Sequence, residues 1–122
     1  MPDNEKFGAV FDQLKRVMQA FETDLAVQAN EPDHYYLNFS PSDKVPKATF
    51  FGAVQIKKNY VSFHLMPVYM YPDLLDGISD ALKKRMQGKS CFNFTALSAE
   101  NLNELAALTE KSVARCRQEQ LF

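Results

Sequence analysis

The stretch that decides the fold is FFGAVQIKKNYVSFHL, residues 50–65. With Lys58 and Asn59 as a two-residue turn, this stretch folds into an antiparallel hairpin with a single register. Because side chains alternate along a strand, each cross-strand pair lies on one face of the sheet. The register pairs Lys57 with Tyr60, Ile56 with Val61, Gln55 with Ser62 and Val54 with Phe63.

The two faces of this hairpin differ in chemistry. One face is apolar and is expected to contact the core: Val54, Ile56, Val61, Phe63 and Leu65. The other face mixes polar, charged and aromatic side chains: Phe51, Gln55, Lys57, Tyr60, Ser62 and His64. A mixed face of this kind can hold a ligand or a protein partner, although it indicates no particular reaction.

Length and composition indicate one ordinary globular domain that covers residues 1–122. Hydrophobic residues make up 46% of the chain and charged residues 24%, which is unlike a disordered or fibrous protein. The formal net charge is −1. A surface committed to nucleic acid or anionic lipid usually carries a large positive excess, so we do not expect nucleic acid as a partner.

The cysteines and the N-terminal residues predict a cytoplasmic protein. Cys91 and Cys116 lie 25 positions apart, without C-x-x-C spacing, so we expect two free thiols in a reducing compartment. The sequence MPDNEKFGAV does not have the pattern of a signal peptide. No stretch approaches the roughly 20 apolar residues of a membrane span, so no membrane association is expected.

Apolar residues at helical spacing predict three helices. The first runs for about 25 residues and stops at Asn30-Glu31-Pro32, and its inward side chains are Phe7, Phe11, Leu14, Met18, Phe21 and Leu25. The second starts at Pro72 and is closed by Gly88, and its inward side chains are Leu74, Leu75, Ile78, Leu82 and Met86. The third is capped by Ser98, and its inward side chains are Leu102, Leu105, Ala106, Val113 and Cys116.

Two further strands are expected, at residues 35–39 and 91–95, and a proline-containing loop at residues 40–49. Pairing of the hairpin should stop at Met66-Pro67, because proline cannot donate to a ladder. The resulting order is α-β-β-β-α-β-α. It predicts an α+β fold, an antiparallel sheet with its helices packed on one face.

Two segments give the chain a resemblance to a known family. They are FFGAVQIKKNYVSFHLMPVY and KKRMQGKSCFNF, within which Lys58-Asn59-Tyr60-Val61 and residues 88–92 are the most recognisable pieces. With the order of elements, they resemble the YdhG-like family of uncharacterised bacterial proteins over nearly the whole chain. The resemblance implies a frataxin-like two-layer α/β sandwich. Because one member has been proposed as an iron chaperone, it also implies iron delivery as an alternative function.

The residues themselves favour a non-enzymatic module that binds a small molecule or a protein through the mixed face. The candidate contacts are Gln55, Lys57, Tyr60, His64 and Tyr69. His64 is also the best candidate for a general base, which leaves a small enzyme as a second alternative. Tyr69 lies in the loop PVYMYP, where an exposed tyrosine could serve a ligand pocket or a homodimer.

A weaker anion-binding site is expected if the hairpin turn and the end of the second helix are adjacent. Its candidate residues are Lys58, Lys84, Arg85 and Lys89. The competing explanation is that cations at a helix C-terminus are stabilised by its dipole. No metal or cofactor is expected, because neither His34 nor His64 has a second ligand at a suitable spacing. The acidic residues of the first helix also do not group on one side as an iron surface would require.

Overall fold

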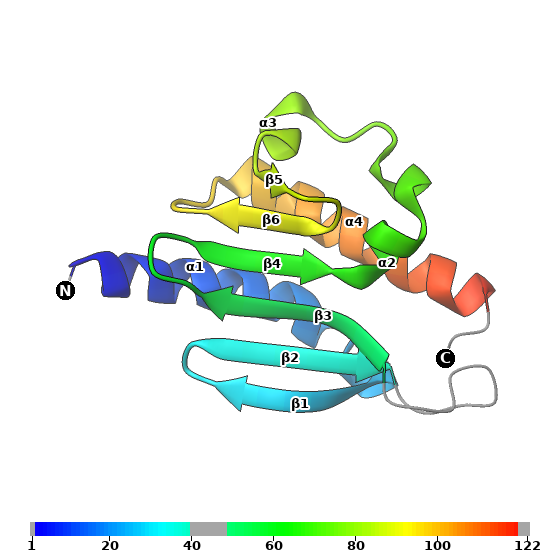
Figure 1. Ribbon diagram of the computed structural model, residues 1–122, viewed down its shortest axis with the longest axis horizontal. Helices are drawn as coiled ribbons and strands as arrows, with labels where there is room; N and C mark the ends of the chain where they lie inside the picture. The colour runs from blue at the N-terminus through cyan, green and yellow to red at the C-terminus, as the bar shows by residue number, and fades with distance from the viewer. Residues whose placement is uncertain (1, 40–48, 120–122) are drawn as a thin grey trace.

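The computed structural model describes residues 2–39 and 49–119, which form an α+β fold around one six-stranded antiparallel sheet (Figure 1). The strand order is β1-β2-β3-β4-β6-β5. The strands are β1 Leu25–Glu31, β2 His34–Phe39, β3 Thr49–Ile56, β4 Val61–Leu65, β5 Met86–Gln87 and β6 Cys91–Phe94. The helices are α1 Pro2–Gln19, α2 Met66–Met70, α3 Asp80–Lys83 and α4 Ala99–Gln118, with short 3-10 turns η1 Glu22–Asp24 and η2 Pro72–Leu75.

The predicted hairpin is confirmed, with its register. Val54 pairs with Phe63, Gln55 with Ser62 and Ile56 with Val61. At the turn the amide of Lys57 donates to the carbonyl of Tyr60 over 2.8 Å. The strand ends at Leu65, and α2 begins with Met66-Pro67, where pairing was expected to stop.

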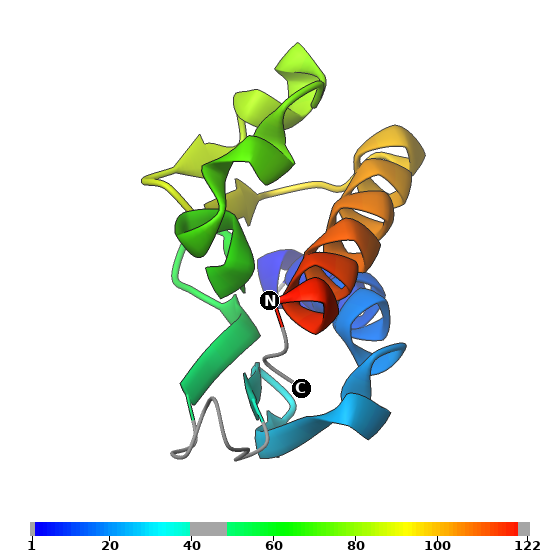
Figure 2. The ribbon, with the colours of Figure 1, turned by 90° about the vertical axis from the view of Figure 1, so that its right-hand side faces the viewer.

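The core lies between the apolar face of the sheet and the two long helices. Helices α1 and α4 cover the same face of the sheet (Figures 1 and 2). The side chains of Val54, Val61, Phe63 and Leu65 are fully buried there. The α1 side chains that pack against them are those predicted from the helical stripe: Phe7, Phe11, Leu14 and Met18.

The prediction of a first helix of about 25 residues was wrong, because α1 ends at Gln19 and a strand follows. Strand β1 pairs antiparallel with β2. Leu25 is the first residue of this strand and its side chain is buried. Its apolar character therefore reflects a place in the core and not a place in a helix. Glu22, in the turn between helix and strand, accepts a hydrogen bond of 2.5 Å from the hydroxyl of Tyr35 on β2. This contact and the ladder with β2 outweigh the local helical pattern.

The second predicted helix, from Pro72 to Gly88, was also wrong as a single element. The segment contains η2, α3 and β5, and Gly77 interrupts it with φ of 85°. Gly88 has φ of 78°, as expected, but it closes the turn between β5 and β6. The predicted loop at 67–72 instead contains most of α2. The apolar residues keep their inward direction, because Leu74 and Leu82 are buried and Leu75, Ile78 and Met86 pack against the core.

The C-terminal elements agree more closely with the sequence prediction. Strand β6 buries Phe92 and Phe94, and the hydroxyl of Ser98 caps α4 by accepting from the amide of Asn101 over 3.0 Å. Ala106, predicted to face inward, is exposed. The small polar residues Thr109 and Ser112 are buried instead, because each hydroxyl donates to the carbonyl four residues earlier over 2.8 Å.

Among the described residues, the long helices cover one face of the sheet and leave the other face uncovered (Figures 1 and 2). Helix α2 follows directly on β4, and α3 lies beside β5 at one edge of the sheet (Figure 1). Compared with the predicted order, the structure adds β1, α2 and β5. Of the loop predicted at residues 40–49, residues 40–48 lie outside the described residues, and Thr49 is the first residue of β3. Among the described helices, none has the length and apolar character needed to cross a membrane.

Candidate functional site

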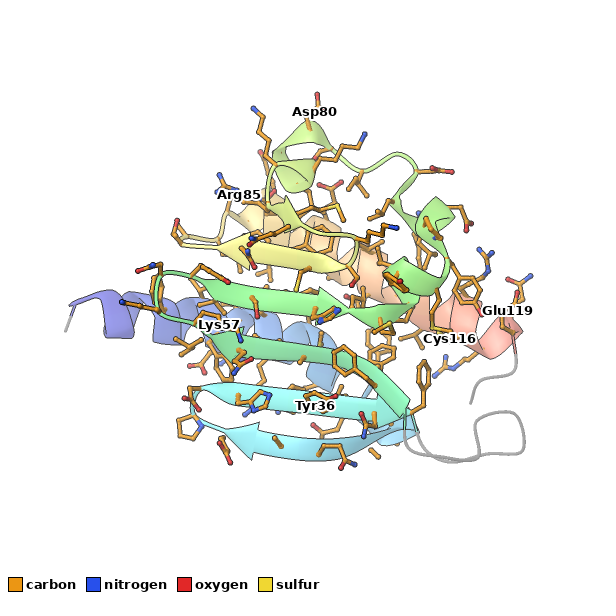
Figure 3. All side chains as sticks on the ribbon, viewed as in Figure 1. Tyr36, Lys57, Asp80, Arg85, Cys116 and Glu119 are labelled. Carbon is orange, nitrogen blue, oxygen red and sulfur yellow. The ribbon has the colours of Figure 1, made fainter. Side chains whose placement is uncertain are left out.

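The face of the sheet opposite α1 and α4 carries a depression of about 500 Å³, here called the central hollow. Figure 3 looks onto this face, with Tyr36 and Lys57 on it. The hollow lies over β2, β3, β4, β6 and β5. Its lining residues are His34, Tyr36, Phe50, Ala53, Gln55, Lys57, Tyr60, Ser62, His64, Gln87, Cys91 and Asn93.

The strand registers explain why the hollow forms. One row across the sheet consists of Tyr36, Ala53, His64 and Cys91, each opposite the next on the neighbouring strand. The methyl group of Ala53 therefore stands between two large rings. The next row is polar and consists of His34, Gln55, Ser62 and Asn93. Two small side chains, Ala53 and Ser62, thus form the floor between larger ones.

A row of four rings borders the hollow, here called the ring row. Its members are His34, Tyr36, Phe50 and His64, from three adjacent strands. The ring centroids of His34 and Tyr36 are 5.8 Å apart, those of Tyr36 and Phe50 4.8 Å, and those of Phe50 and His64 4.8 Å. These separations fall in the range of favourable aromatic contacts. The rings therefore support one another and present a continuous aromatic edge.

The placement of Phe51 on the mixed face was wrong, and Phe50 takes that place. Between β2 and β3, Leu37 pairs with Gly52 whereas Asn38 pairs with Phe50, so Phe51 is an extra residue at an irregularity in the register. Such a bulge interrupts the alternation of side chains. Phe51 is consequently fully buried, with its ring 5.5 Å from that of Phe39.

His64 has a defined partner at the edge of the hollow. Its Nε2 lies 2.7 Å from the Oγ of Ser90, a buried hydroxyl in the turn before β6. Burial lowers the pKa of His64, so its neutral imidazole is favoured. The contact satisfies the serine hydroxyl, and it holds the histidine ring beside Phe50.

The lowered pKa of His64 predicts that the protein loses stability on acidification. The unfolded chain has the ordinary histidine pKa of 6.5, so it binds more protons than the folded chain around and below that pH. The free energy of unfolding should therefore fall between about pH 7.5 and about pH 5.5. Urea denaturation of wild type and His64→Gln at both values tests this, since the variant should show a smaller fall. An identical fall in both proteins contradicts the prediction.

Both cysteines are free, as the sequence predicted, and they differ in exposure. Cys91 is half-buried opposite His64; burial raises the pKa of its thiol, and the charge of Lys57 partly opposes this shift. Cys116 is fully buried in α4, and burial raises its pKa to about 12. These raised pKa values favour the protonated thiols, which are poor nucleophiles.

We expect a maleimide to modify Cys91 of the native protein well before Cys116, because only Cys91 lines a hollow open to solvent. Peptide mass spectrometry after timed labelling measures the two sites separately. Labelling in urea is the control and should modify both thiols equally. Equal rates in the native protein would contradict the burial of Cys116.

The structure brings four of the five predicted contacts together. Gln55, Lys57, Tyr60 and His64 line the central hollow. Tyr69 does not, because it lies on α2 with 55% of its surface exposed. It borders a neighbouring depression of about 340 Å³ that shares His64, Gln87 and Cys91 with the central hollow. The other lining residues were not among the predicted contacts: His34, Tyr36, Phe50, Ala53, Ser62, Gln87, Cys91 and Asn93.

The predicted basic residues divide into separate places. Lys84 and Arg85 line a depression of about 370 Å³, here called the basic hollow, together with Asn59 and Tyr60 of the hairpin end. The hairpin end and the end of α3 are therefore adjacent, as the anion hypothesis required. Lys58 is exposed at the turn but does not line the basic hollow. Lys89 lies elsewhere, with its Nζ 5.9 Å from the centre of the Tyr69 ring.

Within residues 2–39 and 49–119, no group of three or more histidine, cysteine, aspartate or glutamate side chains is placed to hold a metal ion. Comparisons with protein-family models, with curated proteins and with solved structures found no match to this chain. The YdhG-like resemblance therefore stays a prediction.

Proposed function

We propose that this protein is a non-enzymatic binding module whose central hollow takes a small, planar aromatic molecule. The observation that carries this proposal is the ring row beside a floor of small side chains. Tyr36 and His64 stand on either side of Ala53, and Phe50 contacts both rings. A flat ligand placed over Ala53 would contact aromatic side chains along its edge and the sheet along its face.

The size and chemistry of the hollow suit such a ligand. Its volume of about 500 Å³ lies within the range typical of small-molecule sites. Each aromatic pair with the ligand would contribute about 0.5–1.5 kcal/mol beyond area burial. Gln55 and Tyr60, which border the floor, supply polar groups that can orient the ligand.

Filling the hollow should weaken binding of an aromatic ligand. The probe is 2-naphthol, a neutral planar aromatic compound, and its saturated analogue decahydro-2-naphthol is the ligand control. We expect Ala53→Leu to weaken 2-naphthol binding by at least about tenfold, which is a change of about 1.4 kcal/mol, because the leucine occupies the floor between Tyr36 and His64. Calorimetry measures the affinities.

The matched control variant is Ala106→Leu, which makes the same change at an exposed position of α4 on the other side of the sheet. This variant should bind 2-naphthol as wild type does. If Ala53→Leu and Ala106→Leu bind equally, or if the saturated analogue binds as tightly as 2-naphthol, the central hollow is not an aromatic site.

The other assignments from the sequence stay predictions. They are the YdhG-like family, the frataxin-like form of the sandwich, the cytoplasmic location, a homodimer and a protein partner in place of a small molecule. Iron delivery and general-base catalysis by His64 are the alternatives. Calorimetry with ferrous ion tests the first, and a hydrolase and transferase panel with wild type and His64→Gln tests the second.

A further inference from the structure

We propose that the ligand of the central hollow is an anion, with a phosphate or carboxylate held by Lys57, Lys84 and Arg85. This inference rests on the proposed function and names the chemical class of its ligand. The observation behind it is that the central hollow continues into the basic hollow. The two depressions share Tyr60, Gln87 and Asn93 in their linings.

The three cations lie at one end of this joined surface. Lys57 lines the central hollow next to the hairpin turn, and Lys84 and Arg85 line the basic hollow beside it. Figure 3 shows Lys57 and Arg85 at the same end of the sheet. Lys57 and Cys91 both line the central hollow, so the lysine side chain borders the same surface as the proposed ligand. A ligand with its ring over Ala53 can therefore direct an anionic group toward this end.

The linings of the two hollows contain basic side chains and no acidic ones. The chain has 15 acidic and 14 basic residues, yet neither hollow has an aspartate or glutamate in its lining. Arg115 forms ion pairs with Asp73 and Glu119, and neither of these acids lines either hollow. No acidic partner of Lys57, Lys84 or Arg85 is found within the described ranges.

The dipole of a long helix does not account for Lys84 and Arg85. Helix α3 has four residues and ends at Lys83, so its dipole is small. The position of Arg85 is instead fixed by the sheet, because its carbonyl accepts a hydrogen bond of 2.7 Å from the amide of Asn93 on β6. This hydrogen bond fixes the backbone from which the Arg85 side chain extends, so the cation stays beside the basic hollow.

The test compares three probes by calorimetry at low salt: 2-naphthol, 2-naphthyl phosphate and 2-naphthoate. We expect at least one of the two anions to bind wild type about tenfold tighter than 2-naphthol or more, which corresponds to about 1.4 kcal/mol. The relative affinities of the two anions distinguish a phosphate from a carboxylate as the natural group. Inorganic phosphate alone should bind much more weakly, because it has no ring.

The deciding variant is the double substitution Lys84→Ala/Arg85→Ala. It should remove the advantage of the anions and leave 2-naphthol binding unchanged. The matched control is Arg16→Ala/Lys111→Ala, which removes the same charges from exposed positions on the helix layer and should keep the advantage. Thermal denaturation of both doubles verifies that they fold.

The outcomes separate this inference from the proposed function. If 2-naphthol binds but neither anion binds more tightly, or if the advantage survives Lys84→Ala/Arg85→Ala, the anionic class is wrong and the aromatic site stands. If none of the three ring compounds binds, both proposals fail. If the control double loses the advantage as fully as the test double, the effect is one of net charge and the assignment to these residues is overturned.

Discussion

The Phe63→Ala variant is expected to lose about 3–5 kcal/mol of unfolding free energy, which is a large share of the 5–15 kcal/mol typical of a domain. Phe63 lies on β4 in the middle of the covered face, and none of its surface is exposed. Truncation removes its apolar burial and leaves a cavity that the surrounding core side chains cannot close without moving the helices. Urea denaturation measures the loss.

The matched control is Phe50→Ala, which makes the same chemical change on the neighbouring strand but on the other face. Phe50 is only partly buried and lines the open central hollow. No closed cavity forms there, so the loss should be well below that of Phe63→Ala. The assignment of the two faces would be wrong if Phe50→Ala cost as much as Phe63→Ala, or more.

The hairpin could be predicted because everything that fixes it is local. The two residues of the turn and the alternation on each side set the register, and only one register puts Val54, Val61 and Phe63 on one face. The same locality explains why the cap at Ser98 was found, since the serine contacts an amide three residues later. In both places the sequence offers a single local pattern, with no competing one, so sequence reasoning reached the observed structure.

The elements that were missed have two different causes. Strand β1 pairs with β2 through a two-residue turn, but the spacing of Phe21 and Leu25 continues the helical stripe of α1 and so favoured a helix over this local hairpin. The bulge that buries Phe51 arises from the register between β2 and β3, on opposite sides of the segment 40–48. No pattern within either strand indicates at which residue that register changes.

The residues of the candidate site also differ in whether the hairpin alone predicts their position. Gln55, Lys57, Tyr60 and His64 all belong to the hairpin, so their shared face followed from its register. The hollow itself also needs Tyr36, which comes from β2, and Cys91, which comes from β6. Its depth follows from Ala53 standing between two rings on neighbouring strands, and this arrangement requires the order of the strands in the sheet.

The second large effect on stability is expected at Gly52, where α1 packs closely against the sheet. Gly52 lies in β3 beneath this helix, where a Cβ atom would be 2.8 Å from the backbone oxygen of His64 and 2.8 Å from Cε of Met18. The methionine end can move, but the carbonyl of His64 belongs to the ladder between β3 and β4. Gly52→Ala should therefore destabilise the protein by about 1–3 kcal/mol, although alanine is the less flexible residue in the unfolded chain.

Gly8→Ala provides a control with the opposite expected sign. Gly8 lies within α1, and a Cβ atom there would meet no other group within 4 Å. Alanine should stabilise this helix position by about 0.5–1 kcal/mol, because glycine loses more conformational freedom on folding. Urea denaturation of the two variants thus measures the same chemical change in a crowded and in an open position. Stabilisation by Gly52→Ala would mean that α1 does not approach β3 as closely as the structure indicates. Crowding would then not be the reason why residue 52 is a glycine.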